Sequence, residues 1–280
     1  MNKCDPRAPI DREALARSLS GHPWAETIRI LDSIDSTNNY LKRLAAMGAP
    51  EGTVVIAEEQ TAGRGRMGRS FSSQKGVGLY FSVLLRPQLP PERLMHLTCA
   101  VAVAVCDAIE EAAGFRPGIK WINDLVARGK KLCGILAELA LTQSGQVDFA
   151  VVGIGINCAQ EPEDFDPAIR DMAGSLSMIA GRPIDRTALA AACVRAMERL
   201  HTNLNDSAGY LARYRADCIT LGSKIQVIRG DIRRPGQALD IREDGGLVVQ
   251  YTDGTIETVQ SGEVSVRGLY GYTNETEEAL

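Results

Sequence analysis

Three strand-like runs in the middle of the chain lie too close together for helical connections between them. The runs begin at Gly118 (GIKW), Leu132 (LCGILAEL) and Phe149 (FAVVGIGIN). Parallel neighbours in a sheet need a connection of about a dozen residues or more, usually a helix, so we expect these runs to pair antiparallel. Runs at 53–58 and from Gly78 predict two more strands. The pattern predicts an α+β fold with a mixed, largely antiparallel sheet and flanking helices, and it disfavours a doubly wound parallel sheet.

Helical patterns flank these runs. Ser36 is a good N-cap residue, and apolar residues follow it at helical spacing as far as Gly48, where a glycine can end the helix. The stretch from Glu92 to Gly114 predicts a long, mostly buried helix, and the pattern from Arg186 to Asn203 predicts another.

The sequence becomes all-β near Leu221. About five short strands are predicted there. They are separated by Arg-Gly-Asp, Asp-Gly-Gly, Asp-Gly and Ser-Gly turn signals. A segment of about 50 residues is at the low end for independent folding, so we expect it to pack on the larger domain. The predicted organisation is a large domain over 1–220, a small β-barrel over 221–270 and a frayed tail over 271–280.

Composition indicates the cellular compartment of the protein and excludes some classes of function. The chain of 280 residues has a formal net charge of −4, so a nucleic-acid role would need a local basic face. Its seven scattered cysteines form no CxxC pair, which is typical of reduced thiols in a cytosol, and its three distant histidines offer no zinc site. The sequence lacks a signal peptide and any apolar run of membrane-spanning length. We therefore expect a cytoplasmic protein.

The segment GRGRMGR, residues 63–69, alternates glycines with Arg64, Arg66 and Arg69 between two predicted strands. Glycines let backbone N–H groups approach an anion closely, and guanidinium groups bind phosphates through charge-assisted hydrogen bonds. The segment has neither the GK[ST] ending of a Walker loop nor a Rossmann fingerprint followed by a helix. Its chemistry predicts anion binding, with Arg64 and Arg66 on a triphosphate. An exposed, flexible loop that contacts RNA nonspecifically or nothing at all is an equal alternative.

With its flanks, this segment resembles a known family signature. AEEQTAGRGRMGR (57–69) and KWINDLVARGKKLCG (120–134) resemble the paired active-site signatures of biotin protein ligases, whose core fold is shared with class II aminoacyl-tRNA synthetases. The resemblance implies that Gln60 meets the ureido ring of biotin, and Phe71 stands where the family has an adenine-stacking tryptophan. The loop implied to cover the carboxyl end of biotin and the phosphates comprises Gly63, Arg64, Gly65 and Arg66. The C-terminal barrel resembles the family's SH3-like domain.

Upstream, Ser36, Thr37 and Asn38 resemble the family's Ser-Thr-Asn element, which implies that they bind the ureido group. A cyclic urea offers two N–H donors and one carbonyl acceptor, and buried hydroxyl and amide side chains can pair with all three. N-capping by Ser36 alone is the simpler interpretation, and the two roles are compatible.

Downstream, the second signature implies the groups nearest the reacting atoms. Lys131 matches a family lysine seven residues after Asp124, and a cation there lowers the repulsion between a carboxylate and the α-phosphate. The resemblance implies that Asn123 lies on the side of ATP and magnesium and that Asp124 lies near the reacting groups. It implies no fixed metal site. Ile122 replaces the family's usual proline, while every polar group is retained. A solvated hairpin lysine is the alternative for Lys131, and that description fits Lys130 better.

The run VVGIGIN, residues 151–157, resembles a family strand whose terminal asparagine, here Asn157, contacts adenine. Taken alone, its glycines could serve only close packing in a buried strand. The nucleotide site implied by the three motifs comprises Arg64, Arg66, Arg69, Phe71, Asn123 and Asn157. The catalytic groups implied are Lys131, Arg64 and Asp124.

The resemblance implies ATP-dependent biotinylation of a lysine on a biotin carboxyl carrier protein, or on such a domain of a biotin-dependent carboxylase such as acetyl-CoA carboxylase. Biotin and Mg²⁺-ATP would form biotinyl-5′-AMP and pyrophosphate, and the lysine amine would then displace AMP. Family members that bind DNA carry an N-terminal winged helix-turn-helix, for which the residues before Asp35 are too few. We therefore expect no DNA and no membrane partner, and a homodimer stays open.

Two other functions compete with this one. A lipoate or octanoate ligase of the same superfamily would need a long apolar slot and no ureido partners, and it is disfavoured by Ser36, Thr37, Asn38 and Gln60. A non-catalytic nucleic-acid-binding regulator would use GRGRMGR and the small barrel. The negative net charge disfavours it.

Overall fold

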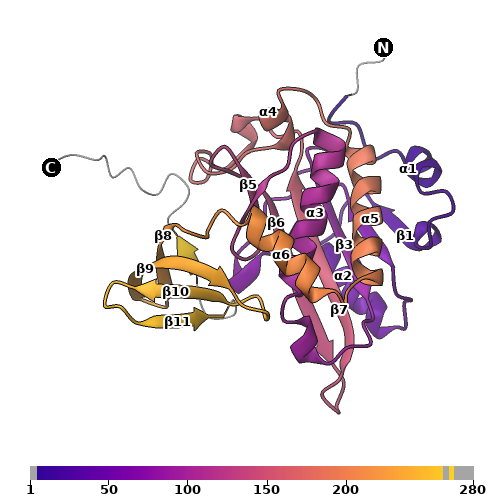
Figure 1. The fold of residues 1–280 in the computed structure, drawn as a ribbon. Helices are drawn as coiled ribbons and strands as arrows, with labels where there is room; N and C mark the ends of the chain where they lie inside the picture. The colour runs from indigo at the N-terminus through magenta and orange to yellow at the C-terminus, as the bar shows by residue number, and fades with distance from the viewer. Residues whose placement is uncertain (1–4, 261–264, 268–280) are drawn as a thin grey trace.

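The computed structural model describes residues 5–260 and 265–267, and residues 28–157 supply a seven-stranded sheet (Figure 1). The strands lie in the order β1-β2-β3-β7-β6-β5-β4. They are β1 (Ile28–Leu31), β2 (Val54–Ala57), β3 (Gly78–Leu85), β4 (Gly118–Lys120), β5 (Asp124–Ala127), β6 (Lys130–Leu141) and β7 (Val147–Asn157). Among these described strands β1 and β2 pair in parallel, and every other neighbouring pair is antiparallel. The predicted α+β fold is confirmed.

The strands from β4 to β7 pair antiparallel in succession, as the short connections predict, but they include one strand more than expected. β5 lies between the runs from Gly118 and Leu132, where the sequence pattern indicates no strand. Its four residues are too few to show a clear alternation. Two left-handed residues, Arg128 (φ 49°) and Gly129 (φ 70°), connect β5 to β6, as the tight turns between adjacent strands require.

Helices lie on both faces of this sheet (Figure 1). They are α1 (Arg12–Ser18), α2 (Thr37–Ala46), α3 (Leu97–Ala113), α4 (Leu176–Ala180), α5 (Arg186–Thr202) and α6 (Ser207–Asp217), with short 3-10 helices at Ala25–Thr27, Arg66–Gly68, Pro91–Leu94 and Pro162–Asp164. The helices expected after Ser36 and from Arg186 are present. The helix expected from Glu92 begins only at Leu97 and ends at the left-handed Gly114. The sequence-based predictions did not include α4 and α6.

Alternation along the strands divides the hydrophobic residues between two cores. Val54 and Ile56 of β2 belong to a large core that includes α3 and α5, whereas Val55 packs with Leu41 of α2 in a smaller core. Successive side chains of a strand point to opposite faces, so α2 covers the face opposite to α3 and α5. The α2 core reaches Leu84 of β3. Beyond that residue the same face becomes polar.

The C-terminal strands form a second sheet, in the order β11-β10-β9-β8-β12. They are β8 (Lys224–Arg229), β9 (Ile232–Ile241), β10 (Leu247–Tyr251), β11 (Ile256–Val259) and β12 (Ser265–Arg267). All of their described pairings are antiparallel. The expected set of about five short strands is therefore confirmed. The domain limits at 220 and 270 stay predictions, and the expected tail over 271–280 lies outside the described residues.

The C-terminal sheet packs against the rest of the chain, as expected for so small a unit. Trp121, directly after β4, donates from Nε1 to Gly245 O (2.9 Å) and from its backbone N to Thr220 Oγ1 (2.9 Å). Arg215 in α6 donates from Nε to Ile241 O (3.1 Å). Because Trp121 also lines the cavity described below, these bonds connect the second sheet to the site.

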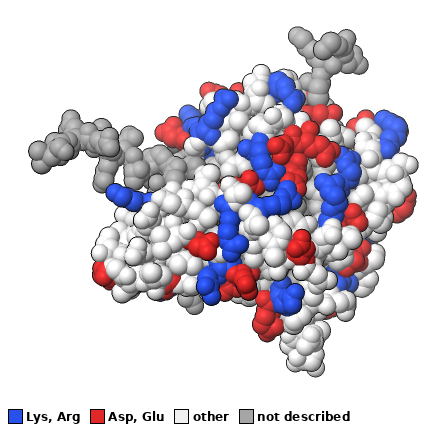
Figure 2. Space-filling view, in the orientation of Figure 1, with Lys and Arg blue, Asp and Glu red and all other residues white. Residues whose placement is uncertain are grey.

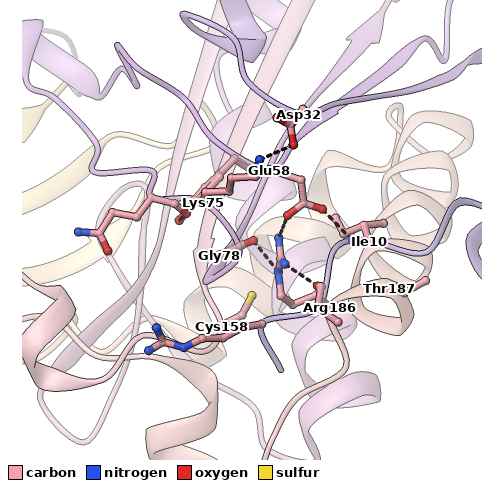
Figure 3. Close-up of polar contacts among 12 residues, drawn as sticks. Ile10, Asp32, Glu58, Lys75, Gly78, Cys158, Arg186 and Thr187 are labelled. Atoms are coloured by element: carbon pink, nitrogen blue, oxygen red, sulfur yellow. Dashed lines mark hydrogen bonds and ion pairs between the residues drawn. The ribbon is translucent and has the colours of Figure 1, made fainter. Parts of the chain in front are cut away.

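A buried ion pair joins the ends of β2 and β3 to the start of α5 (Figure 3). Arg186 NH2 lies 2.6 Å from Glu58 Oε2, and the two side chains are 2% and 6% exposed. Arg186 also donates to Gly78 O (2.9 Å) and Ala8 O (2.9 Å), while Glu58 accepts from Ile10 N (2.7 Å). These hydrogen bonds compensate for the loss of hydration of both charges. They hold the chain in place just before it enters the candidate site.

Charged side chains of both signs are interspersed on the face shown in Figure 2.

The six cysteines in the described ranges carry free, buried thiols, which agrees with the expected reduced state. Burial raises their pKa values, for Cys158 to about 12. None of the helices in the described ranges combines the length and apolar composition that a membrane crossing requires.

Candidate active site

A cavity of about 380 Å³ opens beside α2 and brings together residues from all three sequence motifs. The predicted site residues that line it are Ser36, Thr37, Asn38, Gln60, Arg64, Gly65, Arg66, Arg69, Phe71, Asn123, Asp124, Lys131 and Asn157. Gly63 does not line the cavity. Its backbone O accepts from Phe71 N (2.9 Å), and a Cβ on Gly63 would lie 2.3 Å from Phe71 O. Gly63 therefore allows the two sides of the loop to approach each other.

Glycines of β6 and β7 form the floor of the cavity. A Cβ at Gly153 would lie 2.2 Å from Asn38 Oδ1, and a Cβ at Gly155 would lie 2.6 Å from the Phe71 ring. Gly134, which faces Gly155 across the β6–β7 pair, would place a Cβ 3.4 Å from the same ring. Each glycine leaves space for a predicted site residue, because a larger residue would occupy that space. The close packing considered for the glycines of VVGIGIN is thus present at Gly153 and Gly155, and the groups packed there are predicted site residues.

A hydrogen-bonded cluster of buried polar side chains forms one end of the cavity. Gln60 Oε1 accepts from Thr37 N (2.8 Å) and Thr37 Oγ1 (3.0 Å), and Gln60 Nε2 donates to Ser73 Oγ (2.9 Å). Ser82 Oγ lies 2.8 Å from Thr37 Oγ1 and donates to Asn38 Oδ1 at 2.6 Å. These bonds fix the directions of the amide and hydroxyl groups. Such a preorganised set suits a small ligand with its own N–H and C=O groups.

Ser36 occupies the N-cap position of α2, but its side chain makes no capping hydrogen bond. Its backbone is extended, with φ −159° and ψ 132°, as is usual at this position. The interpretation that its hydroxyl caps the helix is therefore wrong. Ser36 is buried and lines the cavity next to the polar cluster.

The glycine-arginine loop over 63–71 folds as a hairpin. Gly65 N donates to Arg69 O (2.7 Å) across the loop. At its tip Met67 (φ 56°) and Gly68 (φ 73°) are both left-handed, as a type I′ turn requires. Glycine adopts this conformation freely, whereas a methionine does so rarely. The loop is thus a defined structural element with its arginines along the cavity.

Arg64 is held near α2 by a carboxylate of β6. Arg64 NH1 lies 3.2 Å from Glu138 Oε1 and 3.0 Å from Asn39 Oδ1. Glu138 also accepts from Asn38 Nδ2 (2.8 Å) and Lys42 Nζ (3.0 Å). Burial alone would raise the pKa of Glu138, but the hydrogen bonds from Asn38 and Lys42 outweigh it and lower that pKa below its usual value. Glu138 is therefore an anion that links the loop to the polar cluster.

Arg66 lines the cavity and contacts the second motif. Its NH1 donates to Asn123 Oδ1 (2.9 Å), and Asn123 Nδ2 donates to Ile135 O (3.0 Å). Burial lowers the pKa of the Arg66 guanidinium, but a guanidinium remains charged at neutral pH. A cation with little surrounding water attracts an anionic ligand more strongly than an exposed one.

Lys131 and Asp124 form an ion pair on the cavity wall, with Nζ 2.8 Å from Oδ1. The pair lacks hydrogen-bond geometry, and Asp124 Oδ1 accepts no hydrogen bond from the described residues. Lys130 instead donates to Asp171 O (2.7 Å), away from the cavity lining. Lys131 is therefore paired on the cavity wall, while 41% of its side chain stays exposed.

An irregularity in the sheet directs Lys131 to this wall. Lys131 and Gly134 are three residues apart, so a regular strand would place them on opposite faces. The β5–β6 register shifts between Leu125 and Val126, and a bulge of this kind changes the face to which a side chain points. Lys131 Nζ consequently lies 3.5 Å from the place of a Cβ on Gly134, on the floor of the site.

Asn157 ends β7 and holds the loop that precedes α4 near the cavity. Its Nδ2 donates to Gly174 O (3.0 Å) and Lys131 O (3.4 Å), and its Oδ1 accepts from Gln160 Nε2 (3.2 Å). The side-chain amide is therefore engaged by the protein on both sides. Asn157 positions its neighbours and also lines the cavity.

Comparison with known proteins assigns this fold and site to a family. The family model described as "Biotin/lipoate A/B protein ligase family" matches residues 30–157. The model described as "Biotin protein ligase C terminal domain" matches residues 220–267. The biotin–[acetyl-CoA-carboxylase] ligase of Mycobacterium tuberculosis is 35% identical over 267 residues, which cover 92% of this chain and 96% of that protein. The chain belongs to the biotin protein ligase family.

Other biotin protein ligases share sequence and fold with the chain. The bifunctional ligase/repressor BirA of Bacillus subtilis is 36% identical over 239 residues, which cover 84% of this chain and 72% of that protein. A structure of the biotin protein ligase from Aquifex aeolicus in complex with biotin and ATP has a TM-score of 0.72 at 30% identity, over 86% of this chain and 98% of that one. The family and its fold agree with the resemblance in the sequence.

Among the polar residues at this site that sequence reasoning missed, three take part in its hydrogen bonds. Ser82 and Glu138 each stand among apolar residues of a predicted strand, in GLYFSVLL and LCGILAEL. Gln160 follows VVGIGIN by three positions. The available signal was a polar side chain in a buried strand, because such a group needs a hydrogen-bond partner. The partners themselves lie far away in the sequence.

Proposed function

We propose that the chain transfers biotin to a lysine of a biotin carboxyl carrier protein or domain, through biotinyl-5′-AMP formed from biotin and ATP. One observation carries the proposal: a buried polar cluster, a cationic loop and Lys131 lie along one glycine floor. A ligand with a polar head, a carboxylate and a neighbouring triphosphate would meet these groups in turn. The relatives named as biotin ligases support the same reaction.

The polar cluster suits the ureido ring of biotin. The ring offers two N–H donors and one carbonyl acceptor. Ser36, Thr37, Asn38 and Gln60 present hydroxyl and amide groups there, and Ser82 fixes two of them from below. Groups held by their neighbours bind a ligand at a lower cost in entropy than mobile ones. The apolar slot that a lipoate or octanoate ligase needs would not use these partners.

The arginines of the loop suit the phosphates of ATP. Arg64, Arg66 and Arg69 line the cavity, and their guanidinium groups can bind phosphate oxygens in pairs. Magnesium would accompany the nucleotide, since this ion is commonly bound by one or two carboxylates together with substrate phosphates. Asn123, whose Oδ1 accepts from Arg66, lies beside these arginines and stays the candidate residue on the side of the nucleotide and this ion.

Lys131 and Asp124 suit the two chemical steps. In the first, a carboxylate oxygen of biotin forms a bond to the α-phosphorus and pyrophosphate leaves, and the Lys131 cation reduces the repulsion between the two anions. In the second, the acceptor amine attacks the carbonyl carbon of the mixed anhydride and AMP leaves. That amine has an ordinary pKa of about 10.4 and must lose a proton, which the Asp124 carboxylate can accept.

The test of this function is direct. The chain would be incubated with biotin, Mg²⁺-ATP and an unmodified carrier domain, and carrier mass and pyrophosphate would be followed together. We expect a mass gain of one biotinyl group, and none when the acceptor lysine is replaced by arginine. Lipoate and octanoate in place of biotin should give no gain. No mass gain with any biotin carrier would contradict the proposal, and acylation by octanoate alone would favour the lipoate-type function.

A further inference from the structure

One residue of the cavity lining carries a buried side-chain oxygen that has no donor among the described residues. Gln160 lines the cavity and is 4% exposed, and its Oε1 makes no hydrogen bond within the described part of the chain. A buried acceptor without a donor is unfavourable, and such groups are rare in folded proteins. A ligand that brings an N–H group to this oxygen would remove the penalty.

The surrounding hydrogen bonds determine which end of the Gln160 amide is the acceptor. Asn157 Nδ2 donates to Gly174 O (3.0 Å), so Asn157 Oδ1 accepts from Gln160 Nε2 (3.2 Å). Tyr80 OH donates to Gln74 O (3.1 Å), so its oxygen lone pair faces Gln160 Nε2 at 3.5 Å. Exchanging the nitrogen and oxygen of Gln160 would bring acceptors against acceptors. The uncompensated group is therefore the oxygen.

This acceptor lies at the opposite end of the floor from the polar cluster. Gly153, Gly155 and Asn157 alternate along one face of β7, and four residues of a strand span roughly 13 Å. Gly153 lies under Asn38, and Gly155 lies under the Phe71 ring. A ureido ring at the Asn38 end leaves the far end to the second substrate.

The surroundings of Gln160 favour a flat, partly apolar group. Phe71 and Tyr80 pack edge to face, with centroids 6.3 Å apart, and Tyr80 OH touches Gln160. The chain after Gln160 adds Phe165 and Met172 to the lining of the cavity. Aromatic and apolar side chains around one polar acceptor are suited to a nucleobase, and they are less suited to a ribose.

We propose that Gln160 Oε1 accepts a hydrogen bond from the 6-amino group of adenine and so selects ATP among purine triphosphates. The inference rests on the proposed function and adds a specificity-determining residue to it. A base with no group at position 6 leaves the acceptor unpaired. A 6-oxo base sets a second acceptor against it, which is worse.

The experiment compares triphosphates by biotin-dependent pyrophosphate release. Purine riboside triphosphate lacks the 6-amino group, and inosine triphosphate carries an oxygen in its place. For the unmodified chain we expect kcat/KM to fall about tenfold with the first and further with the second. In Gln160→Met, ATP and purine riboside triphosphate should agree within about twofold, because neither gains this bond. The affinity for biotin, measured by calorimetry without nucleotide, should not change.

Gln74→Met is the matched control. Gln74 lines the same cavity, but its Nε2 donates to Asp164 O (2.9 Å), so the variant should still discriminate against purine riboside triphosphate. Equal kcat/KM values for ATP and that analogue in the unmodified chain would overturn the inference, whether or not Gln160→Met folds. Discrimination that survives in a Gln160→Met variant with normal biotin affinity would also overturn it.

Two further outcomes separate this inference from its alternatives. A loss with 2′-deoxy-ATP but not with purine riboside triphosphate would assign the acceptor to the ribose and overturn the role of the base. Failure to release pyrophosphate with every nucleotide would contradict the proposed function itself, and with it this inference.

Discussion

Lys131 is a candidate catalytic residue because of the groups that surround it. Its position in the sequence alone hardly distinguishes it from the neighbouring Lys130. Its Nζ lies 2.8 Å from Asp124 and reaches the glycine floor. Lys130 is one position away, and its Nζ donates a hydrogen bond to the backbone O of Asp171. The direction and the partner of each side chain thus distinguish two lysines that are alike in composition.

Replacing Asp124 by asparagine keeps the size of the side chain but removes its capacity to accept a proton. We expect Asp124→Asn to slow transfer to the carrier by about 10²-fold, the usual contribution of a general base. Formation of the adenylate should slow less. Single-turnover transfer from preformed biotinyl-5′-AMP measures the transfer step, and pyrophosphate release measures adenylate formation. Equal losses in both would count against a proton-accepting role.

Replacing Lys131 by alanine removes the cation beside the reacting carboxylate. We expect Lys131→Ala to weaken binding of biotin and biotinyl-5′-AMP by roughly 10- to 100-fold, since hydrogen bonds to charged groups contribute about 1.5–3 kcal/mol. Calorimetric titration gives both affinities. Lys130→Ala, on the same hairpin, is the control and should bind as the unmodified chain does. Unchanged affinity in Lys131→Ala would remove this residue from the site.

β7 has a site-forming face as well as a core-forming face. On one face Ile154 and Ile156 join the large core, and on the other Gly153 and Gly155 make room for Asn38 and Phe71. The strand period of two assigns these residues to their faces. Its glycines therefore determine how deep the cavity is at two different points.

Adding a methyl group at each glycine should impair one substrate at a time. Gly153→Ala should raise KM for biotin, because the Cβ would lie 2.2 Å from Asn38 Oδ1. Gly155→Ala should raise KM for ATP, because the Phe71 ring must move from its position 2.6 Å from the new Cβ. We expect changes of about tenfold or more, since displacements near 1 Å can cost up to about 10²-fold. Steady-state kinetics would measure both, and the same defect in both variants would contradict separate subsites.

The whole molecule positions the site through contacts that join distant segments. Arg186 and Glu58 bind the N-terminal segment, β2, β3 and α5 together (Figure 3). Trp121 joins the second sheet to the cavity wall. A buried charge without its partner is strongly unfavourable, so the free energy of unfolding should depend on the first of these contacts.

Removing Arg186 should destabilise the fold more than removing an exposed arginine. We expect Arg186→Met to lower the free energy of unfolding by about 3–5 kcal/mol, because Glu58 would stay buried without its partner. Arg17→Met breaks an exposed pair with Glu13 and should cost less than about 1 kcal/mol. Urea denaturation would give both values. The double variant Arg186→Met with Glu58→Met should recover stability, and a loss of the same size for Arg186→Met and Arg17→Met would contradict this role of the pair.

Local sequence patterns were enough to predict much of this fold. Strand alternation and short connections predicted the antiparallel part of the sheet. Glycines predicted the C-terminal ends of α2 and α3, and apolar periodicity predicted α5. The arginines of GRGRMGR indicated an anion site. These features depend on neighbours within a few positions along the chain, and that is why one sequence can reveal them. The short β5, the parallel pairing of β1 with β2, and α6 escaped this reasoning.

Long-range contacts determined which polar groups meet in the cavity. Asn38 and Glu138 are 100 positions apart, and Ser82 and Asn38 are 44 apart, yet they share hydrogen bonds. Gln160 contacts Tyr80 of β3, which is 80 positions away in the sequence. A hydrogen bond depends on distance and angle in space, and local periodicity carries no information about a partner so far along the chain.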